Sequence, residues 1–200
     1  YLASRNPATY KNFKAPASEI RNYSFYKNAK KIICQSSYHE EIAYKNLGLD
    51  NIISVGGNLW SEEILEKFRE FAKKEKQQKC SIMQSNIPHK NTNKSIRYCK
   101  SKNLEYELVS DNNYINFLNK LSNNETLVFF PGTPETLSRV ICEARMMGMS
   151  VTTNSLVGAT KEKWFNKKGL ELIDYMYEKR QEILNIVVDS FGEKSTKNNK

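Results

Sequence analysis

Short apolar runs rich in β-branched residues alternate with longer amphipathic segments, and this alternation most constrains the fold. From residue 79 onward, four strand-like runs are separated by helical patterns. They cover residues 80–84, 106–109, 126–130 and 150–153. Such a pattern is typical of a parallel sheet covered by helices. We therefore predict an α/β fold with a doubly wound parallel sheet.

The rest of the chain extends this pattern in both directions. Strands are predicted at 31–35 and 52–55, and helices at 37–46, 61–76, 91–100, 113–121, 136–147 and 169–191. Gly56 and Gly57 form a natural hinge, because glycine lowers the cost of unusual backbone angles. The predicted domains are 1–57, 58–175, a C-terminal helix at 176–192 and a disordered tail at 193–200.

The charge is strongly positive. The formal net charge is +9, from 31 Lys and Arg against 22 Asp and Glu. A positive field favours polyanions such as nucleic acid, anionic lipid headgroups or phosphorylated small molecules. Much of the excess lies at 67–79 and 193–200, where solvated lysines on exposed helix faces explain it equally well. Charge alone therefore does not choose a partner.

Cysteine and histidine usage favours an intracellular protein without a metal site. The four cysteines form no CxxC pair, and His39 and His89 lie far apart, so we expect reduced, buried thiols and no metal. No apolar run is long enough to cross a bilayer. The chain starts at Tyr1 rather than Met, from which we expect that an upstream part is missing.

Ligands of doubly wound sheets bind outside the carboxyl ends of the strands, which points to the loops at 85–90, 110–112 and 131–135. In the third loop, Glu135 is predicted at a helix start, and Glu143 two turns below it. A helix N-terminus can seat a diphosphate, which a carboxylate would repel. Glu135 could instead accept hydrogen bonds from sugar hydroxyls beyond the phosphates, and Glu143 could accept them from a ribose diol. The alternative is that Glu135 merely complements the helix dipole and Glu143 is a solvated helix glutamate.

The same segment resembles the donor-site signature of the retaining, family-four glycosyltransferases. The matching residues are Pro131, Glu135, Glu143, Ala144, Gly148 and Val151. Residues 31–41, 54–58 and 83–91 resemble, in order, the end of that family's N-terminal domain, its interdomain hinge and the first loop of its donor domain. The resemblance implies the Rossmann-like, donor-binding half of a GT-B fold, plus the end of the N-terminal acceptor domain.

The resemblance also implies a hexosyltransferase-type activity. A sugar would pass with retention from a nucleotide-diphosphate-sugar donor to an unknown acceptor, without metal or cofactor. Lys90 would reach the diphosphate, and Arg139 would add positive charge. Thr136, Leu137 and Ser138 replace the Gly-Phe-Gly usual in the family. The residues that face the acceptor would lie mostly in the absent N-terminal half, so no catalytic residue is assigned, and this fragment alone is expected to catalyse little.

The acceptor class stays open between a glycan, a lipid and a protein. We expect a cytoplasmic protein with peripheral contact to the inner face of a membrane, and no nucleic-acid partner. Two alternatives remain. One is a nucleotide-sugar 2-epimerase, which shares the fold but needs further catalytic carboxylates and a histidine. The other is a non-catalytic module that binds anions through its basic charge.

Overall fold

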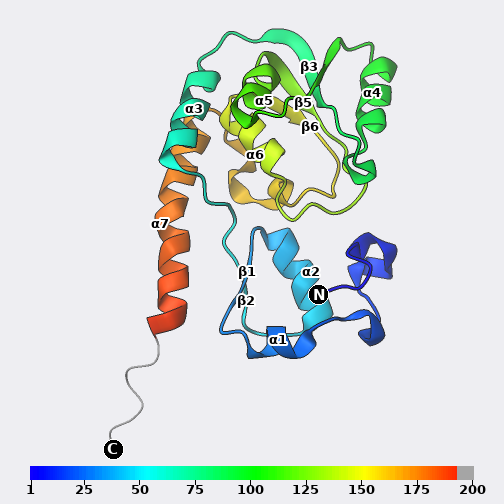
Figure 1. The fold of residues 1–200 in the computed structure, drawn as a ribbon, viewed down its shortest axis with the longest axis vertical. Coiled ribbons are helices and arrows are strands. Elements are labelled where there is room, and N and C mark those ends of the chain that lie inside the picture. The colour runs from blue at the N-terminus through cyan, green and yellow to red at the C-terminus, as the bar shows by residue number, and fades with distance from the viewer. Residues whose placement is uncertain (193–200) are drawn as a thin grey trace, which may run out of the picture.

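The computed structural model describes residues 1–192, so the predicted disordered tail at 193–200 lies outside the described residues. The predicted α/β class is confirmed: the strands form parallel sheets, and a long helix closes the described chain. Figure 1 shows a small lobe around β1 and β2, a larger lobe around the other strands, and α7 running alongside both. The predicted domain boundaries, including the division at residue 57, stay predictions.

All strand pairs within the two sheets are parallel. The small sheet pairs β1 (Ile32–Cys34) with β2 (Ile52–Ser54). The large sheet has the order β4-β3-β5-β6. Its strands are β3 (Gln77–Met83), β4 (Tyr106–Val109), β5 (Asn124–Val128) and β6 (Ser150–Thr152). The chain winds outward from β3 to one edge and then from β5 to the other, so the gap between β3 and β5 is the topological switch point.

Helices cover the sheets as the alternation predicts. The α-helices are α1 (Tyr23–Asn28), α2 (Ser37–Leu47), α3 (Glu62–Ala72), α4 (Thr92–Ser101), α5 (Tyr114–Leu121), α6 (Arg139–Met146) and α7 (Leu170–Gly192). Short 3₁₀ turns occur at Pro7–Thr9, Lys11–Phe13, Ala17–Glu19, Pro88–Lys90, Gly158–Lys161 and Lys163–Asn166. Side-chain caps begin several helices: Ser36 accepts from the His39 N–H, and Ser61 from the Ile64 N–H.

Two helix boundaries differ from the prediction by three residues or more. Helix α3 ends at Ala72, before the predicted residue 76, and the Lys76 ammonium donates to the Phe71 carbonyl near that end. The prediction that a helix starts at Thr136 was wrong, because α6 begins at Arg139. The preceding residue Glu135 instead forms a parallel bridge with Val157, which holds this segment in an extended conformation.

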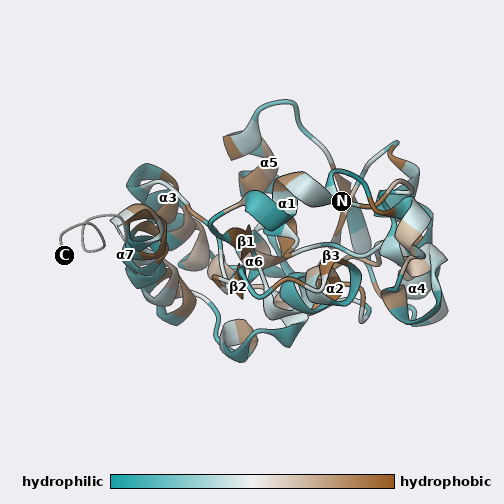
Figure 2. Ribbon diagram, turned by 90° about the horizontal axis from the view of Figure 1, so that it is seen from below, coloured by the Kyte–Doolittle hydropathy of each residue, from teal (hydrophilic) through white to brown (hydrophobic). Residues whose placement is uncertain are grey.

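The larger core lies between the sheet, α3, α5, α6 and α7. Its fully buried side chains include Phe68, Leu118, Leu127, Ile141, Met146, Trp164 and Ile173. Helices α3 and α7 lie side by side, with hydrophobic and hydrophilic residues along both (Figure 2), and ion pairs Arg69–Asp174 and Arg180–Glu62 join them.

The two lobes are also joined by polar contacts. The Trp164 indole N–H donates to the Gly56 carbonyl over 2.7 Å and fixes the predicted hinge. Glu162 accepts from both the backbone N–H and the hydroxyl of Ser37, over 2.7 and 2.9 Å. These bonds hold the small lobe against the segment that follows β6.

Candidate functional site

An ion pair spans the topological switch point of the large sheet. Lys90 Nζ lies 2.8 Å from Glu135 Oε1, with side chains only 24% and 15% exposed. Lys90 ends the 3₁₀ turn in the loop after β3, and Glu135 lies in the loop after β5. The backbone joins the same loops, because the Gly132 N–H donates to the His89 carbonyl over 2.7 Å. The structure thus brings two of the predicted site residues together.

A second acid–base cluster surrounds Glu143, which is 3% exposed. The Tyr114 hydroxyl donates to Glu143 Oε1 over 2.6 Å, and Arg139 Nη2 lies 3.3 Å from the same oxygen. Burial raises the pKa of Glu143, while Tyr114 and Arg139 oppose that rise. A buried carboxylate is costly unless it is paired, and these two partners supply the pairing. Glu143 is therefore not the solvated helix residue of the alternative reading.

Trp60 adds a further donor beside this carboxylate. It comes from the linker between the lobes and is 3% exposed. Its indole N–H is close enough to lower the pKa of Glu143. Among residues 1–192, however, this N–H forms no hydrogen bond of acceptable geometry. Trp60 therefore adds a buried indole donor to the surroundings of the carboxylate.

Tyr114 is one of the site residues that sequence reasoning missed. It is the first residue of α5 and follows the 110–112 loop, which had been singled out as a ligand loop. The residue is 40% exposed, and the Arg139 guanidinium carbon lies 5.8 Å from the centroid of its ring. Its position directly after that loop was the available signal, but nothing local showed that it would reach Glu143.

The three residues at 136–138 lie in different environments. The Leu137 side chain is in the core, so only its backbone can face a ligand. The Thr136 hydroxyl donates to Gln35 Oε1 of the small lobe over 2.8 Å. Ser138 has φ +72° and is buried, and its hydroxyl has no partner among the described residues. This serine holds a positive φ that glycine adopts more readily.

One cavity of about 320 Å³ lies beside the Glu143 cluster, and we call it the α3–α5 cavity. It is lined by Leu59, Trp60, Ser61, Glu63, Ile64, Lys67, Tyr114, Ile115 and Arg139. Tyr114 and Arg139 therefore contact both this cavity and the carboxylate behind it. Its volume is at the lower end of the range for small-molecule pockets.

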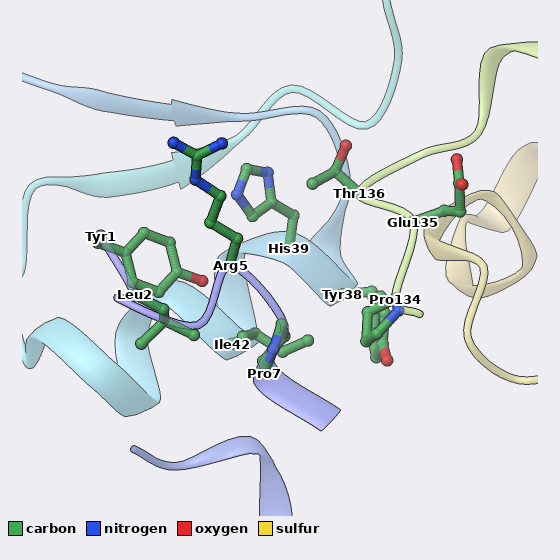
Figure 3. A pocket seen from close by; sticks show the side chains of 10 residues that line it. All are labelled: Tyr1, Leu2, Arg5, Pro7, Tyr38, His39, Ile42, Pro134, Glu135 and Thr136. Carbon is green, nitrogen blue, oxygen red and sulfur yellow. The ribbon is translucent and has the colours of Figure 1, made fainter. Parts of the chain in front are cut away.

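A second cavity of about 260 Å³ lies between the lobes, and we call it the interlobe cavity. Figure 3 shows Tyr38 and His39 of α2 on one side, Glu135 and Thr136 on the other, and Arg5 from the N-terminal segment. The Tyr38 hydroxyl and His39 Nδ1 are buried and have no partner in the described part of the chain. Burial lowers the pKa of His39, so its imidazole is neutral near pH 7. Neither residue was predicted to belong to a site.

Two kinds of feature are absent from residues 1–192. Within residues 1–192, no three His, Cys, Asp or Glu side chains gather closely enough to form a candidate metal site. The helices in that part of the chain all lack the combination of length and apolar character that crossing a bilayer requires.

Comparisons with known proteins give a structural likeness and no match in sequence. No protein-family model matches the chain, and no curated protein matches it. A similar solved structure is a glycosyltransferase from Rickettsia africae ESF-5. The match has 16% sequence identity and a TM-score of 0.44, and covers 86% of this chain. The chain spans 63% of the length of that glycosyltransferase. A likeness at this level says nothing about the site or its chemistry.

Proposed function

We propose that this chain carries the donor site of a glycosyltransferase that uses a nucleotide-diphosphate sugar and retains the anomeric configuration. The observation that carries the proposal is the buried Glu143 carboxylate, held by Tyr114 and Arg139 beside the α3–α5 cavity. A carboxylate in this place suits a ribose diol, which presents two adjacent hydroxyl donors. The sequence resemblance at 131–151 supports the same assignment.

The switch-point pair would serve the other end of the donor. The Lys90 ammonium is a compact positive charge. It would stabilise the negative charge on the diphosphate as the bond between its oxygen and the anomeric carbon breaks. Glu135 would accept hydrogen bonds from hydroxyls of a hexosyl group. Lys90 would then be shared between Glu135 and the diphosphate, which fixes the carboxylate next to the phosphates. Arg139, with its side chain 56% exposed, can add a second positive charge.

The interlobe cavity is the place that we assign to the acceptor. It adjoins Glu135, so an acceptor hydroxyl there would face the sugar on the donor. Retention requires attack from the face that the diphosphate leaves, and the lobes would hold both substrates in that geometry. The class of acceptor stays open.

A titration of the complete protein with a panel of sugar nucleotides tests this function. Saturable binding is expected, and Glu143→Ala should weaken it by about tenfold or more, since a hydrogen bond to a charged group contributes about 1.5–3 kcal/mol. The matched control is Glu178→Ala, because Glu178 is an exposed glutamate on α7. Binding that Glu143→Ala leaves unchanged, or binding to any polyanion that salt abolishes, would contradict the proposal.

A further inference from the structure

The second half of α7 carries an exposed apolar stripe. Its members are spaced so that they share one face of the helix, and they are Leu184, Val187, Val188 and Phe191. Phe191 is 68% exposed, whereas Ile183 on the adjoining face of the same helix is buried. Residues 1–192 therefore cover one face of this half of α7 and leave the next face open.

Helix α1 exposes a second apolar group at the same end of the molecule. Phe25 is 72% exposed, and Tyr23 is exposed as well. Figure 1 shows α1 and the C-terminal end of α7 at the end of the molecule away from the large lobe, and Figure 2 looks onto that end. A contact joins the two helices, because Nζ of Lys30, just after α1, lies 4.9 Å from the centroid of the Phe191 ring. We call this combined area the α1–α7 surface.

The α1–α7 surface is also rich in unpaired positive charge. Four exposed basic residues lie in α1 or beside it, namely Arg21, Lys27, Lys30 and Lys31. No acid occurs at 20–39, and within residues 1–192 none of the four bases forms an ion pair. Two exposed acids of the same region, Asp50 and Asp189, reduce the excess without cancelling it. The sequence at 193–200, which follows α7, adds three lysines against one glutamate.

Exposed apolar side chains among unpaired bases suit an anionic lipid surface. The apolar groups can enter the boundary between headgroups and acyl chains, while each Lys or Arg near the anionic headgroups strengthens binding by roughly fivefold. Nucleic acid would use the bases but offers no apolar counterpart to an aliphatic helix face. A second copy of the chain would bring two positively charged surfaces together, and they would repel each other. Charge and hydrophobicity together therefore favour the bilayer.

We propose that the α1–α7 surface binds the anionic face of a lipid bilayer. Phe25, Val188 and Phe191 are its apolar anchors, and the four bases contact the negatively charged headgroups. This inference gives a location to the peripheral membrane contact expected from the sequence. It does not rest on the proposed sugar-nucleotide site, because none of these residues belongs to that site.

The first experiment is co-sedimentation of the complete protein with lipid vesicles. Vesicles in which about one-third of the phosphatidylcholine is replaced by phosphatidylserine should bind at least about tenfold more tightly than pure phosphatidylcholine. Added salt should weaken that binding, since it screens the charges. Equal binding to both kinds of vesicle, or no binding to either, would overturn the proposal. So would tighter binding to a DNA duplex than to the anionic vesicles.

The second experiment removes positive charge from the surface. The double variant Lys27→Gln with Lys30→Gln should bind anionic vesicles about tenfold or more weakly. The matched control is Lys100→Gln with Lys102→Gln, which removes the same charge from exposed positions in the large lobe. An equal loss in the two double variants would show that net charge alone attracts the protein, and it would overturn the assignment to this surface.

The third experiment removes the apolar anchors. Phe25→Ser with Phe191→Ser should weaken binding to anionic vesicles severalfold, and thermal unfolding should be unchanged because both side chains are exposed. Leu104→Ser, at an exposed leucine of the large lobe, is the control and should bind as the parent does. Unchanged vesicle binding in the phenylalanine variant would overturn the role of the anchors. A dimer of the complete protein that this variant dissociates would assign the surface to self-association instead.

Discussion

The Tyr114 hydroxyl donates a hydrogen bond to Glu143 Oε1 over 2.6 Å, from the first residue of α5 to the second turn of α6. The two helices follow different strands of the large sheet, so the bond joins two of the ligand loops. Burial raises the pKa of both groups, and the carboxylate raises that of the phenol further. This pair therefore combines an energetic cost with a fixed geometry, a combination common at binding sites.

Replacing Tyr114 by Phe should destabilise the fold. The substitution removes the hydrogen bond to a buried carboxylate and leaves its ion pair with Arg139, and a lost bond to a charged group costs about 1.5–3 kcal/mol. Urea unfolding of the two proteins gives the difference in the free energy of unfolding. Tyr177→Phe, which changes an exposed tyrosine on α7, is the control. Equal stability of Tyr114→Phe and the parent protein would show that the hydroxyl does not stabilise the carboxylate.

The raised pKa of Glu143 predicts a pH dependence of stability. A carboxyl group whose pKa is higher in the folded state binds more protons there than in the unfolded chain. The free energy of unfolding therefore falls as the pH rises from 4.5, the ordinary pKa of the group, to its raised pKa in the folded protein. The cost is then fully present at higher pH. Glu143→Gln lacks this titration, so its stability relative to the parent should increase over that interval. Unfolding curves of both proteins from pH 4 to pH 8 measure it; a constant difference would contradict the prediction.

The Lys90–Glu135 pair should contribute moderately to stability. Its side chains are neither fully buried nor free in solvent, so we expect Lys90→Met to cost about 1–2 kcal/mol, between surface and buried pairs. A double-mutant cycle with Glu135→Gln isolates the coupling between the two charges. A coupling energy of zero would mean that the pair does not hold the two loops together. Under the proposed function, both single variants also weaken binding of sugar nucleotides.

Ser138→Gly should stabilise the protein. A non-glycine residue at φ +72° carries about 1–3 kcal/mol of strain, and the extra entropy of glycine in the unfolded chain offsets about 0.5–1 kcal/mol of the relief. A net gain of about 1 kcal/mol is expected in thermal or urea unfolding. Ser138→Ala keeps the Cβ atom and its strain but removes a hydroxyl that is buried without a partner among residues 1–192, so it measures the effect of the hydroxyl alone, and Ser138→Gly should gain more than Ser138→Ala. If both variants behave alike, the backbone conformation is not the source of the effect.

Gly158→Ala should disrupt the contact between the lobes. A Cβ atom at this position would collide with the Thr136 carbonyl and with the hydroxyl of Ser36, which caps α2. The backbone carbonyl cannot move aside cheaply, so a loss of about 1–3 kcal/mol is expected. Gly48→Ala, where φ is +62° and no atom lies within 4 Å of the added carbon, measures backbone strain without crowding. The larger loss should occur at Gly158.

Local patterns were enough to locate the strands and α-helices from β1 onward. Strand β4 has the predicted bounds, and the bounds of the other strands differ from the predicted ones by three residues at most. Side-chain periodicity reports which face of an element is buried, and that information is local. The start of α6 was predicted wrongly because Glu135 pairs with Val157, and a bridge over more than twenty residues leaves no local pattern.

The sequence by itself determined the α/β class, the loops at the carboxyl ends of the strands, and Glu135, Glu143 and Lys90 as candidates. Only the tertiary structure decided that Lys90 meets Glu135 across the switch point, that Tyr114 and Trp60 surround Glu143, and that Tyr38 and His39 face an interlobe cavity. The reason is physical. Periodicity and capping depend on neighbours along the chain, whereas a site is made by side chains that become neighbours only when separate strands and lobes pack together.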